Sequence, residues 1–190
     1  EAGMGDAFLC VGVESMTMVP QGGFNFSPNP LLQANTDAYI SMGETAENVA
    51  HRWKENRADQ ELLALQSHLK AAAARDQGLL VDEIVPILLP DGELLDADGC
   101  IRPATTLEAL AGLKPAFRPD GAVTAGTSSP LTDGAAAVLV TRDDFAERHG
   151  LQALARIRSF ATVGVDPAIM GIGPIPAARK ALARAGLTVA

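Results

Sequence analysis

The sequence predicts an α/β protein in which pieces of an α/β core flank an inserted, mainly helical segment. Short apolar runs typical of buried strands stand near both ends of the chain, at residues 7–13 and 135–141. Between them, from Glu44 onward, apolar residues recur at helical spacing. The most economical interpretation is one core interrupted by an inserted subdomain over roughly residues 20–131.

Composition narrows the class of protein. Of the 190 residues, 47% are apolar and 20% are charged, which is ordinary for a globular protein. The net charge of −8 argues against a nucleic-acid partner, and an anionic ligand would have to be met locally by a few Arg or Lys. Cys10 and Cys100 show no disulfide pattern, and the chain has no membrane-length apolar run or signal peptide. We therefore expect a reducing, cytoplasmic location.

The first half of the chain predicts a strand followed by two helices. Residues 7–13 (AFLCVGV) read as a buried strand, and the Pro- and Gly-rich residues 20–33 as an excursion from it. A first helix follows Glu44, and Asn56 caps a second that ends at Gly78. The residues expected on the buried side of the second helix are Leu62, Leu63, Leu65, Ala71 and Ala72.

The second half predicts a series of shorter elements. Pro86 assigns the strand-like residues 83–89 to a sheet edge. Helix 174–186 has Pro in its first turn and Gly at its end, as helix termini favour. The other expected elements are short helices at 106–113 and 143–149, and strands at 121–126, 135–141 (buried) and 153–162.

The side chains that most often perform catalysis are poorly placed in this sequence. His51, His68 and His149 have no Cys or carboxylate at metal-ligand spacing, so structural or surface roles are expected. Cys10 lies inside an apolar run and Cys100 in an acidic loop, and neither context suits a nucleophilic thiolate. We assign no catalytic residue and no metal site.

Residues 124–137 (TAGTSSPLTDGAAA) form the most distinctive stretch of the chain. They predict a strand, a turn of small and hydroxyl-bearing residues, and a second strand. Small side chains let a ligand approach the backbone, and the hydroxyls can bond the amide groups of an extended ligand. The alternative is a well-capped turn with no ligand.

The same stretch resembles the thiolase signature, and other segments resemble that family in the same order along the chain. GVESM (12–16) is similar to the end of the strand before the thiolase loop domain, and SMGETAEN (41–48) to the stretch where that domain contacts the pantetheine arm of coenzyme A (CoA). Residues 101–117 resemble the adenine-side segment, and residues 161–187, which contain DPAIMGIGP, the start of the C-terminal half. The match covers essentially the whole chain.

The resemblance implies a partial thiolase-like α/β fold with four parts. Residues 1–19 would end the N-terminal thiolase domain, and 20–131 would be the CoA-binding loop domain. Residues 132–152 would return to the N-terminal domain, and 153–190 would begin the C-terminal domain. The implied parent protein is an acyl-CoA C-acyltransferase that cleaves 3-ketoacyl-CoA with CoA, or condenses acetyl-CoA units. CoA would be a substrate, with no further cofactor, and the intact protein would be a homodimer or homotetramer.

Three implied binding residues lie in the 124–137 turn. Ser129 occupies the position whose hydroxyl bonds the pantetheine amide in the family, and Ala125 and Pro130 would flank it. The Thr-Ser-Ser-Pro form of this turn resembles degradative 3-ketoacyl-CoA thiolases more than biosynthetic ones.

Three more implied binding residues lie elsewhere in the loop domain. Met42 would pack on the pantetheine arm, Arg102 would pair with the CoA nucleotide, and Phe117 would lie near the adenine. The alternatives are a core Met42 and a solvated loop Arg102. Some thiolases have a His and a Ser where this chain has Ser41 and Ala109, so contacts at these two points are in doubt.

The family's reacting residues have no counterpart here. Thiolases use a Cys nucleophile upstream of the strand that begins this chain, and an NEAF-type Asn, a GHP His and a CxGxG Cys downstream. None of these motifs occurs in the sequence. We therefore expect an internal fragment that is inactive alone. The alternatives are a non-catalytic CoA- or lipid-binding module, and a piece that folds only by association.

Overall fold

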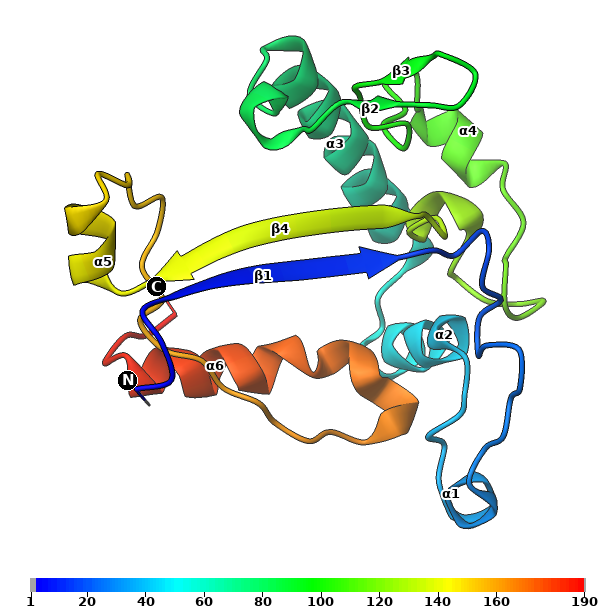
Figure 1. Cartoon of the computed structure of the whole chain (residues 1–190). Coiled ribbons are helices and arrows are strands. Elements are labelled where there is room, and N and C mark those ends of the chain that lie inside the picture. Colours follow the sequence, from blue (N-terminus) through cyan, green and yellow to red (C-terminus); the bar gives the residue numbers. More distant parts are fainter. Residues whose placement is uncertain (1–2, 190) are drawn as a thin grey trace. The chain divides into compact units, whose positions relative to one another are not determined.

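The computed structural model describes residues 3–189 and divides them into two compact units (Figure 1). The first unit contains the chain up to Thr36, Leu131–Val165, and the residues from Ile172 on. The second contains Asp37–Pro130 and Asp166–Gly171. Helices and strands occur in a mixed order, as the predicted α/β class requires. No helix within residues 3–189 combines the length and the apolar character needed to cross a membrane.

The first unit is built on a two-stranded antiparallel ribbon of β1 (Ala7–Glu14) and β4 (Gly134–Thr141). Their register runs from Ala7 opposite Thr141 to Glu14 opposite Gly134. The strands expected at 7–13 and 135–141 are thus confirmed, but the expectation that they are buried is wrong. Leu9 and Val11 are 70% and 66% exposed, because no other layer within residues 3–189 covers the ribbon.

Helices follow the ribbon in the first unit. A six-residue helix α1 (Pro30–Asn35) interrupts the loop after β1, and α5 (Asp143–Arg148) follows β4. Helix α6 (Pro174–Arg184) begins at a proline and is followed by Gly186, which has a left-handed φ of +69°, as expected.

The strand predicted over residues 153–162 is wrong. These residues form no ladder, because a strand needs a neighbouring strand and none of the described residues provides one. The segment instead bonds to α6. The Lys180 Nζ donates to the Thr162 carbonyl at 3.1 Å, and Arg184 Nη1 donates to the Phe160 carbonyl at 2.7 Å.

Two longer helices dominate the second unit. Helix α2 (Met42–Trp53) begins after Ser41, whose Oγ accepts the Glu44 N–H. Helix α3 (Arg57–Asp76) begins after Asn56, whose Oδ1 accepts the Asp59 N–H at 2.9 Å, as predicted. Beyond its end, Gly78 has a left-handed φ of +72°.

The buried side of α3 differs from the prediction. Ala72 is buried as expected, but Leu62 and Leu63 are exposed, and the other buried residue is Glu61. The reason is that α3 packs through its Glu61 side against α4 (Leu107–Ala111) and the 3-10 helix η2 (Ala125–Thr127), whereas Leu62 lines an open cavity beside α4 and Leu63 is 69% exposed.

The remaining elements of the second unit are short. A 3-10 turn at Val81–Glu83 precedes strand β2 (Ile87–Leu88), which pairs with β3 (Leu94–Leu95). The strand predicted over 83–89 is therefore limited to two residues. The strand predicted over 121–126 is reduced to one bridge between Pro115 and Thr124, because the chain turns into η2 immediately afterwards. A last 3-10 helix, η3 (Pro167–Ile172), begins in this unit.

Candidate functional site

A cavity of about 350 Å³ opens in the second unit between α2, the residues around η2 and the start of η3. Most of its lining is apolar, with a threonine hydroxyl and two polar side chains added. Its lining residues are Met42, Thr45, Ala46, Val49, Ala50, Glu55, Gln60, Val123, Thr127, Met170 and Gly171. An apolar wall with a few polar groups is typical of a site for a largely uncharged organic chain.

Helix α2 supplies one wall of this cavity. The residues Met42, Thr45, Ala46, Val49 and Ala50 stand at i, i+3, i+4, i+7 and i+8, so they share one face of the helix. The Thr45 Oγ1 donates to the Met42 carbonyl at 2.7 Å, so this hydroxyl is already bonded within the helix. The helix therefore presents a narrow apolar stripe to the cavity.

The second wall comes from the turn that contains η2. Thr127 Oγ1 accepts the Thr124 N–H at 3.0 Å, and Ser128 Oγ donates to the Thr124 carbonyl at 2.8 Å. These bonds fix the turn from inside and leave Thr127 on the cavity wall. Thr124 is fully buried, and its Oγ1 has no partner among residues 3–189.

Two hydroxyls of this turn are thus used as caps, as the ligand-free alternative for residues 124–137 supposed. Ser129 differs from them. It is exposed, and its hydroxyl bonds no other group in the described part of the chain. Ala125 and Pro130 are exposed on either side of it. Ser129 is therefore free to bond a ligand, and its predicted role stays a prediction.

Met42 and Phe117 lie at the same end of α2. Met42 is the first residue of the helix, lines the cavity and is 67% exposed, so it does not belong to the core of residues 3–189. The Phe117 ring covers Gly43 so closely that a Cβ at position 43 would collide with the ring. Phe117 therefore packs beside Met42 without lining the cavity. Ser41, where some relatives have His, caps α2.

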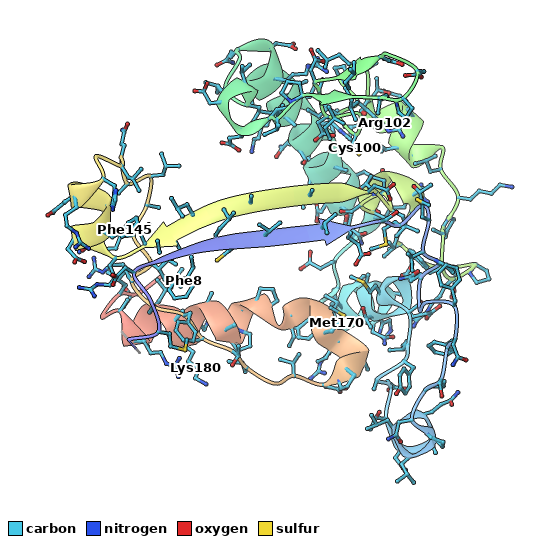
Figure 2. All side chains as sticks on the ribbon, viewed as in Figure 1. Phe8, Cys100, Arg102, Phe145, Met170 and Lys180 are labelled. Carbon is cyan, nitrogen blue, oxygen red and sulfur yellow. The ribbon has the colours of Figure 1, made fainter. Side chains whose placement is uncertain are left out.

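Arg102 lies in another part of the second unit. Its backbone N–H donates to His68 Nδ1 at 3.2 Å, and its exposed guanidinium pairs with no carboxylate of residues 3–189. Figure 2 shows Arg102 near β3 and α4, well away from Met170 at the cavity. A ligand that used both Met42 and Arg102 would have to be long, as CoA is.

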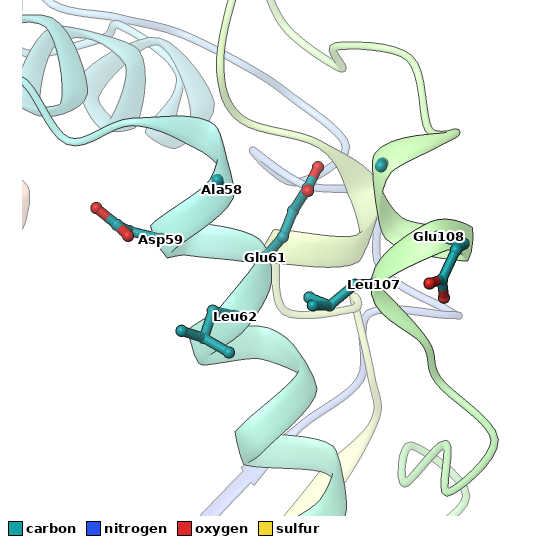
Figure 3. Close-up of a pocket in the computed structure, with 7 residues that line it drawn as sticks. Ala58, Asp59, Glu61, Leu62, Leu107 and Glu108 are labelled. Carbon is teal, nitrogen blue, oxygen red and sulfur yellow. The ribbon is translucent and has the colours of Figure 1, made fainter.

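A second cavity, of about 460 Å³, lies between α3 and α4 (Figure 3). Its charged lining is entirely acidic, from Asp59, Glu61 and Glu108. The nearest cation, Arg57, is already bonded to Glu61 at 2.5 Å. An acidic wall repels an anionic ligand, so this cavity is a poor site for a phosphate-bearing molecule such as CoA.

The two cysteines are free thiols in unsuitable surroundings. Cys10 is exposed on β1, which corrects the expectation that it is buried, and it lies opposite Val138 rather than a base. The Cys100 N–H donates to the Asp98 carboxylate at 2.8 Å, in the acidic loop described from the sequence. No group of three His, Cys, Asp or Glu in residues 3–189 could hold a metal ion. Neither cysteine is given a catalytic role.

Of the residues that line the cavity, sequence reasoning found only Met42, and Thr127 and Met170 are among those it missed. Met170 is 44% exposed on η3 and lines the cavity together with Met42 and Thr127. It belongs to the DPAIMGIGP stretch, from which no site residue was predicted. The signal was a second methionine within a conspicuous segment, but only the fold brings residue 170 beside residue 42.

The chain matches two family models over nearly its whole length. Residues 1–144 match "Thiolase, N-terminal domain", and residues 151–190 match "Thiolase, C-terminal domain". It is 47% identical to an acetyl-CoA acetyltransferase of Paracoccus denitrificans and 48% identical to a 3-ketoacyl-CoA thiolase of Erwinia tasmaniensis. Both alignments cover 98% of this chain.

Solved structures agree with the sequence matches. The dimeric peroxisomal thiolase of Saccharomyces cerevisiae superimposes with a TM-score of 0.88 at 43% identity, over 96% of this chain and 48% of that one. Human mitochondrial 3-ketoacyl-CoA thiolase gives a TM-score of 0.83 at 39% identity, over 96% of this chain and 50% of that one. These likenesses confirm the partial α/β fold predicted above. The chain spans about half the length of the curated relatives it matches, 52% and 50% of the two named here.

Proposed function

Because this chain belongs to the thiolase family, we propose that the whole protein is an acyl-CoA C-acyltransferase acting on 3-ketoacyl-CoA or acetyl-CoA. A cysteine thiolate would attack the 3-keto carbon, the C2–C3 bond would break, and the C2 carbanion would take a proton from the family's second Cys and leave as acetyl-CoA. A second CoA thiol would then take the acyl group from the cysteine. The 190 residues of this chain would bind CoA and would not perform these steps.

The observation that carries this proposal is the convergence of three family segments on one cavity. Met42 comes from SMGETAEN, Thr127 from TAGTSSPLTDGAAA and Met170 from DPAIMGIGP. Their sequence positions are far apart, and each segment resembles a part of the thiolase family. The mainly apolar wall, with the polar groups of Thr127, Glu55 and Gln60 added, suits the pantetheine arm, which is a flexible chain with two amide groups.

The remaining predicted residues would hold the rest of CoA. The free hydroxyl of Ser129 would bond a pantetheine amide, with Ala125 and Pro130 leaving room beside it. The unpaired guanidinium of Arg102 would meet the phosphates of the nucleotide, since a protein of net charge −8 must supply cations locally. Phe117 would lie near the adenine. CoA would be a substrate, and no cofactor is proposed.

We also propose a direction for the reaction, a cellular location and an oligomeric state. The relatives named acetyl-CoA acetyltransferase and 3-ketoacyl-CoA thiolase are almost equally similar to this chain, at 47% and 48% identity. The Thr-Ser-Ser-Pro turn favours the degradative direction, as in β-oxidation of fatty acids. We further propose a cytoplasmic location and a homodimer or homotetramer; the yeast thiolase, which is described as dimeric, supports the dimer.

Titration calorimetry of the full chain with CoA tests the site. Ser129→Ala and Arg102→Ala should each raise the dissociation constant for CoA about fivefold to tenfold, because each loses a bond to a polar or charged group. Ser67→Ala and Arg158→Ala are matched controls, since both side chains are exposed and neither belongs to the site. Unchanged affinity in both site variants would remove the assignment.

A second candidate function is a non-catalytic CoA- or lipid-binding module. It needs only the binding groups of these residues and none of the family's reacting motifs. The same cavity and the same Ser129 would serve it. Sequence of the gene on either side of this chain distinguishes the two, because an enzyme needs a Cys-Ser-Ser-Gly-like motif upstream and GHP and CxGxG downstream.

A further inference from the structure

Helix α2 has a second, polar face that the proposed function does not use. Glu44, Glu47 and Asn48 stand at i, i+3 and i+4, so their side chains project from one side of the helix. Glu47 is only 4% exposed, and no cation of residues 3–189 pairs with its carboxylate. A charge that is buried without a counter-ion needs hydrogen-bond donors to remain stable.

Glu47 obtains these donors from the second wall of the cavity. Its Oε2 accepts the Ala122 N–H at 3.0 Å, and its Oε1 accepts the Val123 N–H at 2.9 Å. A Cβ on residue 121 would collide with the carboxylate, so Gly121 is required for this approach. Val123 lines the cavity, and the turn that carries Thr127 follows directly. Glu47 therefore fixes that wall to α2.

Asn48 makes the corresponding bond to the third wall of the cavity, which Met170 and Gly171 of η3 form. Its Nδ2 donates to the Ala168 carbonyl at 2.9 Å, two residues before Met170. Its Oδ1 accepts from Arg118 Nη2 at 2.8 Å, and Arg118 also pairs with Glu44. Only this orientation of the amide satisfies both partners, because a carbonyl cannot donate and a guanidinium cannot accept.

We propose that Glu47 and Asn48 are positioning residues that set the width of the cavity. The apolar face of α2 contacts the ligand, while the polar face holds Val123 and Thr127 on one side and Met170 on the other. Neither Glu47 nor Asn48 touches the ligand. This inference rests on the proposed function, in which the cavity takes the pantetheine arm of CoA.

The test measures binding of two separate probes, pantetheine for the cavity and pyrophosphate for the nucleotide phosphates. In Glu47→Gln an amide NH₂ replaces one acceptor and faces a backbone N–H, and in Asn48→Asp a carboxylate oxygen faces the Ala168 carbonyl. Each variant of the full chain should bind pantetheine about tenfold more weakly by titration calorimetry, as the loss of one buried hydrogen bond implies. Affinity for pyrophosphate, which stands for the nucleotide phosphates that Arg102 would meet, should stay at the wild-type value, because Arg102 lies away from the cavity.

Two further variants distinguish failure of the proposed function from failure of the positioning inference. Glu61→Gln changes an equally buried carboxylate of the same unit that does not line the cavity, so it should leave pantetheine affinity unchanged. Met42→Asp places a charge on the cavity wall and should weaken pantetheine binding. If Met42→Asp has no effect, the proposed function itself fails. If it weakens binding while Glu47→Gln and Asn48→Asp bind normally, or if Glu47→Gln weakens both probes equally, only the positioning inference is overturned.

Discussion

Asp133 illustrates how a single side chain joins two distant segments of this protein. It stands just before β4, and its Oδ1 accepts the Thr17 N–H at 2.9 Å, at the end of the ribbon where Glu14 lies opposite Gly134. This backbone hydrogen bond, with a smaller contribution from the Thr17 side chain, lowers the pKa of Asp133 below its ordinary value of 3.8. The family signature thus contains one residue whose evident task is structural.

The bond predicts a dependence on pH. Because the folded-state pKa of Asp133 lies below 3.8, the bond's contribution is complete above that pH and is lost as the pH falls through the folded-state value. The Thr17 amide proton shift, followed by NMR, should titrate with a midpoint below 3.8 in the wild type and stay flat in Asp133→Asn. A midpoint at or above 3.8 would contradict the assignment.

Close backbone approaches explain two other residue choices that the sequence left unexplained. Gly43 leaves space for the Phe117 ring, and Gly121 leaves space for the Glu47 carboxylate. Both glycines therefore matter for what packs against them and not for an unusual φ. Nothing in the local sequence names the partner of either glycine, because Phe117 and Glu47 are more than seventy residues away in the chain.

At the scale of elements, Arg57 joins two helices. Its Nε bonds Glu61 on the next turn of α3, and its Nη2 donates to the carbonyls of Leu110, Ala111 and Leu113 at the end of α4. One guanidinium therefore neutralises a buried carboxylate and also satisfies the free carbonyls at a helix C-terminus. Glu61, the carboxylate that Arg57 neutralises, is among the residues that line the cavity in Figure 3.

Arg57→Ala should lower the free energy of unfolding by about 3 kcal/mol, because it leaves the Glu61 carboxylate buried without a partner. The change is read from the midpoint of urea denaturation. Arg75→Ala is the matched control on the same helix, since the Arg75–Asp76 pair is exposed and should contribute at most about 0.5 kcal/mol. Equal effects of the two substitutions would show that Arg57 is an ordinary surface arginine.

Elements with local signals were predicted from the sequence, and elements that depend on distant partners were not. The spacing of apolar residues predicted α2, α3 and α6. The residues at helix ends predicted the Asn56 cap of α3 and the proline and glycine that bound α6. The strand expected over 153–162 fails because a strand requires a neighbour. The buried side of α3 was misjudged because Glu61, not Leu62 or Leu63, is the residue buried against α4 and η2. Likewise, Met42 was found through its motif, whereas Thr127 and Met170 needed the fold.

At the scale of the whole molecule, we expect this chain to bind CoA without catalysing the reaction of the family. The purified 190-residue chain should bind CoA but show no thiolysis of acetoacetyl-CoA, because no residue matches the family's nucleophile, its Asn, its His or its second Cys. Thiolysis is followed as loss of the 3-ketoacyl absorbance after CoA is added. Turnover above that of a heat-denatured sample would contradict the expectation and would require Cys10 or Cys100 to be reconsidered.

The ribbon of β1 and β4 has a consequence for how such proteins can be rebuilt. Because Glu14 lies directly opposite Gly134, the chain departs from the ribbon and comes back to it at adjacent Cα atoms, about 5 Å apart. A tight two-residue turn could close that gap as a hairpin. The larger part of the second unit, Asp37–Pro130, is therefore a single insertion between two paired residues, and only Asp166–Gly171 of that unit comes from elsewhere in the chain.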